Sequence, residues 1–290
     1  MSDRSDVIFV YDGSFDGIMC CIFYCYYEKT MPSDIRPSDE EQLMLGAYID
    51  IITDCEKAER VRSAIKTKLG EDFLKIVQRL SLSFEEDREL LILKFVILGF
   101  KYGRRVLSRL ADNTVNRVMK VESYVAKEAH LSLEFLRFSD YGGVLVAVIE
   151  PKNTVLPLIA DHFADRLRPE RFMIFDKNHK MAVIHEPGRT EIIYIDSLDL
   201  PRASEEERKF RALWRSFYNI IGIKERYNPR CRMNHCPKRY WGNMTEFNDD
   251  EDNYSDKPSL SEGVLLSDDV ISSADMLSES SISSESSTEV

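Results

Sequence analysis

A run of cations and aromatic rings near residue 230 is the strongest chemical signal in the sequence. Lys224 to Trp241 has the sequence KERYNPRCRMNHCPKRYW, with six cations against one acid, Glu225. Cations neutralise phosphates and flat rings stack on unpaired bases, so this composition is typical of a nucleic-acid-binding surface. The predicted contact residues are Arg226, Arg230, Arg232, Lys238, Arg239, Tyr240 and Trp241.

The same segment has a structural alternative as a C-terminal clasp. Its rings would then pack into the core, and its arginines would pair with surface carboxylates. Asn228-Pro229 and Cys236-Pro237 interrupt helix formation, so we expect the segment to wrap over the body as a loop. The two roles are compatible, because a clasp can still expose some of its cations.

A second candidate lies at Asp161-His162-Phe163-Ala164-Asp165-Arg166, on a helix predicted after Pro157. His162 and Arg166 are four residues apart, so both project from one helix face and could contact one phosphate or base edge. Imidazole titrates near neutral pH, which makes His162, with Asp161, a candidate for general acid/base catalysis. The alternative is a polar helix face that Asp/Arg pairs stabilise.

The third candidate is Tyr11-Asp12-Gly13-Ser14-Phe15-Asp16-Gly17, where a predicted strand runs into a predicted helix. Such a junction offers free backbone N–H groups, which suit a phosphate, so Ser14 is a candidate nucleic-acid contact. Asp12 is a candidate acid/base, although two carboxylates oppose anion binding unless a metal intervenes. The alternative is a turn in which Ser14 or Asp16 caps the helix.

Several familiar signatures are absent from the sequence. It has no Walker loop, GxGxxG, HExxH or GxSxG, which disfavours nucleotide hydrolases, dehydrogenases and zinc proteases.

The cysteines are expected to be structural. Cys20, Cys21 and Cys25 fit a buried helix as core thiols. Cys231 and Cys236 flank His235, but no second Cys/His pair at ligand spacing lies nearby. No metal and no cofactor are therefore expected.

The elements that position these candidates indicate an α+β fold, a helix-rich body with a small, largely antiparallel sheet. The pattern predicts strands at 7–11, 50–53, 144–150, 172–176, 181–185 and 191–195. It predicts helices at 16–27, 56–69, 71–80, 113–138, 157–167 and 205–221, and a long helix to Tyr102 with Ser83 as its N-cap. Helices cluster in the middle and strands later, which favours α+β over regular βαβ winding.

Charge divides the chain into a near-neutral body and an acidic tail. Met244 to Val290 holds thirteen acidic residues and one lysine, a net of −12 that leaves +1 for Met1 to Asn243. We therefore expect one compact domain over residues 1–247 and a disordered Ser-rich tail over 248–290, which could fold back and compete with DNA. The apolar runs are too short to span a membrane, and the N-terminus is not a targeting signal, so the expected location is the cytoplasm.

Three segments together resemble a known bacterial family. VYDGSFDGIMCCIF, PLIADHFADRL with FMIFDKNHKMAVIHE, and RYNPRCRMNHCPKRYWGNMTEF are similar to uncharacterised proteins labelled putative DNA-metabolism or DNA-repair proteins, over about residues 6–247. The resemblance implies a partner that is a radical-SAM DNA-repair protein or a uracil-DNA glycosylase-like domain. It implies no catalytic residues, and the acidic tail and Cys231, His235 and Cys236 depart from the family pattern.

The leading hypothesis is a DNA-binding accessory protein in DNA repair. One alternative is an enzyme acting on a nucleobase or nucleotide, with His162, Asp161 and Asp12 as acid/base groups. Another is a scaffold without catalysis, whose basic segment grips carboxylates of a partner protein. The residue pattern leaves open whether the chain is an enzyme and whether it prefers single-stranded or duplex DNA.

Overall fold

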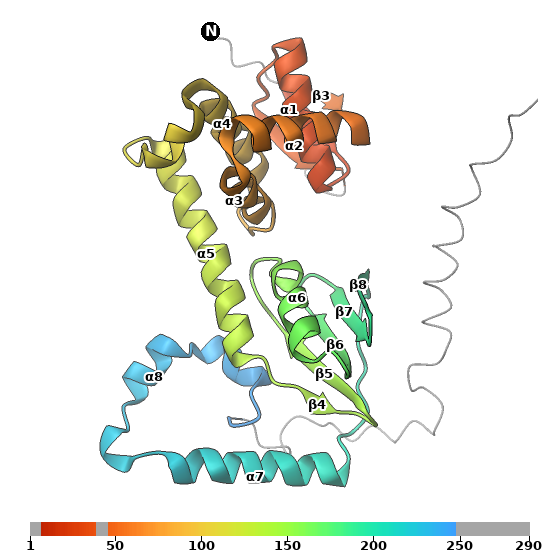
Figure 1. Cartoon of the computed structure of the whole chain (residues 1–290), viewed down its shortest axis with the longest axis vertical. Helices are drawn as coiled ribbons and strands as arrows, with labels where there is room; N and C mark the ends of the chain where they lie inside the picture. Colours follow the sequence, from red (N-terminus) through yellow and green to blue (C-terminus); the bar gives the residue numbers. More distant parts are fainter. Residues whose placement is uncertain (1–6, 39–45, 248–290) are drawn as a thin grey trace, which may run out of the picture.

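The computed structural model describes residues 7–38 and 46–247 of the chain (Figure 1). Its helices and two sheets confirm the α+β prediction. The predicted acidic tail, residues 248–290, lies outside the described residues. No helix in the described part is long and apolar enough to cross a membrane.

A three-stranded parallel sheet forms the N-terminal end of the molecule. β1 (Val7–Tyr11) lies between β2 (Asp34–Pro37) and β3 (Ala47–Asp50), and α1 (Phe15–Glu28) packs against it. The prediction of a single sheet was therefore wrong, because this parallel sheet is present in addition to the later one. The sequence pattern did not predict β2, because its sequence, DIRP, is short and polar. It also ends in proline, a residue that sequence patterns place in a turn.

Helices follow this sheet and share its core. They are α2 (Cys55–Leu69), α3 (Glu71–Ser81), α4 (Arg88–Tyr102), the 3-10 turn η1 (Gly103–Ser108) and α5 (Asn113–Phe135). Their apolar faces pack around stacked Phe73 and Phe95, whose ring centroids are 4.3 Å apart. The predicted cap at Ser83 was wrong, because a turn intervenes, Asp87 precedes the helix, and Ser83 is buried.

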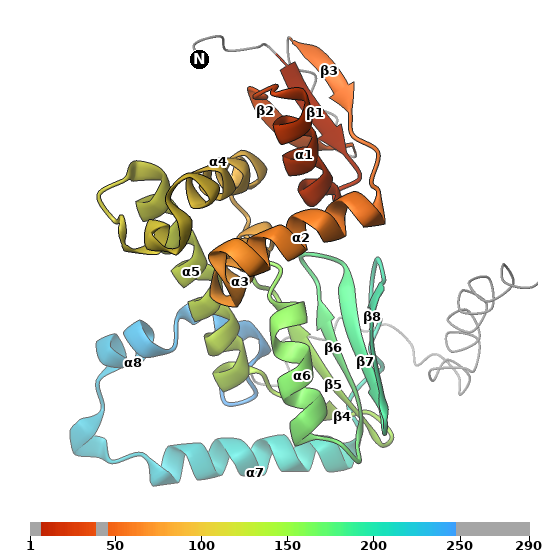
Figure 2. The same cartoon turned by 45° about the horizontal axis from the view of Figure 1, so that its top comes forward.

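The second sheet has five strands and is mixed. Its order is β4 (Ser139–Asp140), β5 (Val144–Ile149), β6 (Arg171–Asp176), β7 (Met181–Glu186) and β8 (Arg189–Tyr194). α6 (Leu156–Arg166) makes the crossover that sets β5 parallel to β6, whereas the other pairs are antiparallel. The predicted meander from 172 to 195 is confirmed. α6 and the end of α5 cover one face of this sheet (Figure 2).

The C-terminal part consists of α7 (Glu205–Ile221), η2 (Lys224–Arg226), α8 (Pro229–His235) and η3 (Lys238–Asn243). α7 has no buried residue and extends away from the sheets (Figures 1 and 2). The loop expected over residues 228–237 is a short helix instead, because Asn228 caps it and Pro229 suits its first position. The prediction that residues 1–247 form one domain stays a prediction.

Candidate nucleic-acid interface

Two buried carboxylates attach the C-terminal segment to the end of α5. Arg137, just after α5, donates to Glu246 at 2.7 Å, and the Glu246 side chain is only 2% exposed. Burial is the largest single influence on the pKa of Glu246 and would raise it. The hydrogen bonds and charge of Arg137, together with hydrogen bonds from the backbone and from Trp214, outweigh burial and hold the pKa below its ordinary value. The second carboxylate, Glu128 of α5, pairs with Arg239 at 3.0 Å. This much of the predicted clasp is present.

Glu128 connects three separate parts of the chain. It is 3% exposed and accepts hydrogen bonds from the backbone N–H groups of Lys152 at 3.1 Å and Asn153 at 2.8 Å. The side-chain amide of Asn153 donates to it as well, at 2.5 Å. One carboxylate therefore joins α5, the loop between β5 and α6, and η3 through Arg239. A buried charge with this many partners fixes the geometry around it.

A frame of aromatic rings surrounds Arg232. Its guanidinium carbon lies 4.9 Å from the ring centroid of Trp241 and 5.2 Å from that of Phe247, and these two rings stack at 4.6 Å. The indole N–H of Trp241 donates to the carbonyl of Cys236 at 3.0 Å. Arg232 and Trp241 thus hold the segment together. Tyr240 has a similar role, because its ring packs against Phe135 of α5.

The remaining cations of the segment face solvent. Arg226, Arg230 and Lys238 are exposed, and none of them pairs with a carboxylate within residues 7–38 and 46–247. Tyr227 beside them is 69% exposed. The predicted contact set therefore divides in two. Three cations and one ring remain open to a ligand, while Arg232, Arg239, Tyr240 and Trp241 also have structural partners.

The two cysteines of the segment have different surroundings. Cys231 is exposed, whereas Cys236 is buried with its sulfur 3.6 Å from the Met244 sulfur. Burial raises the pKa of the Cys236 thiol, which opposes the thiolate that a metal would need. Among the described residues, no group of His, Cys, Asp or Glu has the geometry of a metal site.

The turn after β1 is a helix cap. The Ser14 hydroxyl accepts from the Gly17 N–H at 2.9 Å and donates to the Asp12 carboxylate at 2.7 Å. Burial would raise the pKa of Asp12, but the hydrogen bonds from the Ser14 hydroxyl and backbone N–H help to lower it below its ordinary value. A depressed pKa makes Asp12 a weak base at neutral pH. Ser14 and Asp12 stay predictions as site residues, and their present contacts are those of a cap.

Gly17→Ala tests this tight turn. An added Cβ would lie 2.4 Å from the Asp12 carboxylate oxygen and 2.6 Å from the Tyr11 ring. The carboxylate cannot move away without losing its bonds to Ser14. We expect a loss of about 1–2 kcal/mol, because overpacking outweighs the helix propensity that alanine gains. Thermal unfolding measures this, with exposed Ser63→Ala on α2 as the control. An unchanged melting temperature would contradict the close packing.

The α6 candidates lie on the surface of the second sheet's helix layer. Asp161, His162 and Arg166 are all exposed, and the His162 ring is edge-on to Phe163 at 5.3 Å. The expected Asp/Arg pairing is formed by Asp165 with Arg168, at 2.8 Å, and leaves Arg166 exposed. Asp12 follows a strand of the other sheet, and no described contact connects it with His162. The acid/base role of these residues stays a prediction.

Sequence reasoning missed Glu128, Arg137 and Glu246. A signal for Glu128 was present, since it continues the buried stripe Val118, Val121 and Val125 along α5. A charged residue inside an apolar helical stripe indicates a buried partner. Glu246 had no such signal, because it follows a 3-10 turn in an acidic context.

Comparison with known protein families assigns a family to residues 86–246, which include the basic segment. A family model described as a domain of unknown function, DUF4130, matches residues 86–246. The chain belongs to this family. The DUF4130 region begins at the turn before α4 and ends at Glu246, so it includes Glu128, Arg137 and the basic segment. The parallel sheet with Asp12 and Ser14 lies outside it.

Further comparisons add little to the DUF4130 assignment. No curated protein matches the chain. A solved structure described as the pGpG-specific phosphodiesterase PggH from Vibrio cholerae matches at 12% identity and a TM-score of 0.30, covering 76% of this chain and 100% of its own. A similarity of that size carries no conclusion about fold or activity.

Proposed function

We propose that this protein binds DNA through Arg226, Arg230, Lys238 and Tyr227, as an accessory protein in DNA repair. The observation that supports this is the set of three exposed cations without carboxylate partners in the described part of the chain, next to a ring that is 69% exposed. Lysine and arginine neutralise phosphates, and an exposed tyrosine can stack on an unpaired base. The DNA-repair setting rests on the family resemblance.

The accessory role is supported by α7. Its apolar stripe remains exposed at Phe210 (69%), Leu213 (66%), Phe217 (52%) and Ile220 (83%). Contiguous exposed apolar side chains mark protein interaction surfaces. We place the radical-SAM or glycosylase-type partner on this stripe, beside the DNA-binding cations. The acidic tail begins after Phe247, whose ring stacks on Trp241, and would compete with DNA for the same cations.

Neutralising the three cations tests DNA binding. Fluorescence anisotropy titrations of the full chain with duplex and single-stranded oligonucleotides, at salt between about 50 and 200 mM, give the slope of log affinity against log salt. Arg226→Gln, Arg230→Gln and Lys238→Gln together are expected to reduce the magnitude of that slope by about 2–3, because each lost phosphate contact contributes about 0.7–0.9. Affinity should fall on the order of tenfold or more.

The matched control removes the same charge elsewhere. Lys57, Lys177 and Lys180 each pair with a carboxylate, at 3.2, 3.2 and 3.1 Å. Their triple glutamine variant should keep the wild-type slope. Equal losses in both triple variants would show that only net charge matters and would remove the basis for a site at residues 226–238.

A further inference from the structure

A second group of unpaired cations lies at the opposite end of α5. Its members come from the end of α2, the end of α4, η1 and the following turn: Lys68, Lys101, Arg104, Arg105 and Arg109. All five are exposed, and none pairs with a carboxylate within the described ranges 7–38 and 46–247. We refer to these five residues as the η1 surface.

Contacts with two aromatic rings bring the η1 surface together. The Lys68 ammonium lies 5.6 Å from the Phe100 ring centroid, so the end of α2 meets the end of α4. Lys101 and Arg109 both lie over the Tyr102 ring, at 5.1 and 4.1 Å. Both rings are partly buried, and the cations that lie over them are exposed to solvent.

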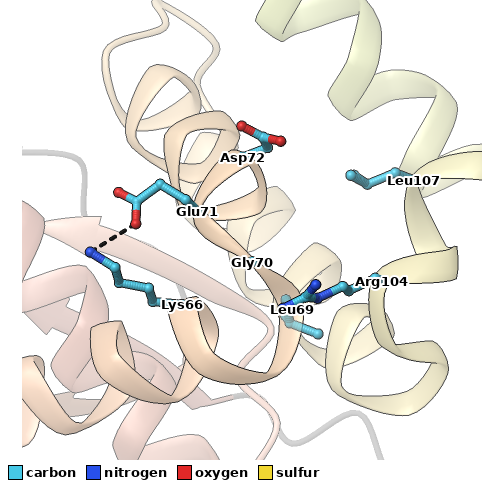
Figure 3. Close-up of a pocket in the computed structure, with 7 residues that line it drawn as sticks. All are labelled: Lys66, Leu69, Gly70, Glu71, Asp72, Arg104 and Leu107. Carbon is cyan, nitrogen blue, oxygen red and sulfur yellow. Dashed lines mark ion pairs between the residues drawn. The ribbon is translucent and has the colours of Figure 1, made fainter.

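An open hollow of about 410 Å³ adjoins this surface (Figure 3). Arg104 extends along one side of it, close to Gly70, and the N-terminus of α3 forms another side. Of the five cations, Arg104 lines the hollow itself. Of the two carboxylates that line it, Glu71 is paired with Lys66 at 2.8 Å. The surface is therefore strongly positive beside a depression that can admit a phosphate group.

The distance between the two cationic regions indicates their common ligand. α5 has 23 residues and begins shortly after η1, while Glu128 and Phe135 near its other end hold Arg239 and Tyr240. At 1.5 Å per residue, Glu128 and Phe135 lie about 23 and 33 Å along the helix from its first residue, so the segment that they hold is separated from η1 by on the order of one turn of B-form DNA. Both views place the η1 segment and α8 on the left of α5 (Figures 1 and 2).

We propose that the η1 surface is a second contact for the phosphate backbone of duplex DNA, one helical turn from residues 226–238. This inference rests on the proposed DNA binding and adds the ligand's form, a duplex lying along α5. Because the exposed side chains of this surface are cations and its two rings are partly buried, the surface contacts phosphates without reading bases. A spacing of one turn returns the backbone to the same side of the duplex, so both contacts can form at once.

Salt-dependent titration of the full chain tests this surface. On a duplex of about 20 base pairs, Lys101→Gln, Arg104→Gln and Arg105→Gln together should reduce the salt slope by about 2–3. The charge-preserving variant Lys101→Arg, Arg104→Lys and Arg105→Lys should keep the wild-type slope. That result would show that positive charge at these positions, rather than the identity of each residue, is what DNA binding requires. A duplex of about 8 base pairs cannot span one turn, so its binding should lack the advantage that the longer duplex gains from two contacts.

The outcomes separate this inference from the proposed function. If the η1 variant keeps the wild-type slope while the Arg226, Arg230 and Lys238 variant loses it, the inference is overturned and the proposed interface stands. The reverse result supports the η1 surface and rejects the proposed interface. If the η1 variant loses binding to phosphatidylserine vesicles but not to duplex, the surface is a membrane contact and the inference is overturned.

Discussion

Glu128→Ala is expected to lower the free energy of unfolding by about 3–5 kcal/mol, since it removes the acceptor of a buried ion pair and of several hydrogen bonds. Glu128 is 3% exposed, so its carboxylate is bound by protein donors. Arg239 loses its carboxylate, and the N–H of buried Asn153 loses its acceptor. Each buried donor left without an acceptor costs about 1–3 kcal/mol. Urea unfolding measures the loss.

A volume-preserving variant and a matched control complete this experiment. Glu128→Gln keeps the packing but replaces one accepting oxygen with a donor, so it should still lose at least about 2 kcal/mol. Glu134 lies on the same helix, is about half exposed and, among the residues that the structure describes, pairs only with exposed His130. Glu134→Ala should change stability by less than about 0.5 kcal/mol. Equal effects at both positions would show that Glu128 does not organise the C-terminal segment.

Arg137→Ala is expected to weaken the attachment of the C-terminal segment to α5 at neutral pH. It leaves Glu246, 2% exposed, without its cation, at a cost of about 2–3 kcal/mol. The two tryptophans of the chain, Trp214 and Trp241, both lie in the C-terminal part, so their fluorescence during urea unfolding reports the weakened attachment.

The effect of Arg137→Ala should depend on pH with a defined sign. In the wild type the pKa of Glu246 is held below its ordinary value, so the ion pair stabilises the fold above that value and is lost as pH falls through the depressed pKa. The difference between variant and wild type should therefore stay constant from about pH 7 down to the ordinary carboxyl pKa and narrow only below that value. A difference that does not narrow there would contradict a charged Glu246. Exposed Arg168→Ala is the control, because its pair with Asp165 is about three-quarters exposed on both sides.

Most long elements followed from sequence patterns. The bounds of β1 and α7 were predicted to the residue, and those of α2, α3 and α6 to within one residue, because apolar periodicity is strong there. The parallel sheet was not predicted. Its strands β2 and β3 have four residues each, and their pairing with β1 is set by contacts distant in sequence.

The candidate site could be predicted in composition but not in arrangement. The composition of the basic segment predicted a binding surface. The cations that face solvent, however, are decided by tertiary contacts, namely the pair of Arg239 with Glu128 and the packing of aromatic rings around Arg232. The η1 surface was missed for the same reason. Lys68 is far in sequence from Arg104 and Arg105, and only the packing of α2 against α4 and η1 gathers them.

Photo-crosslinking is the most direct test that residues 226–238 contact DNA. The full chain is irradiated with a duplex or a single strand that carries photoreactive bases, and mass spectrometry identifies the attached peptides. The account predicts crosslinks at Tyr227 and its neighbours that disappear in the Arg226→Gln, Arg230→Gln, Lys238→Gln variant. Crosslinks confined to α6 around His162, or no crosslinks with either DNA, would contradict it.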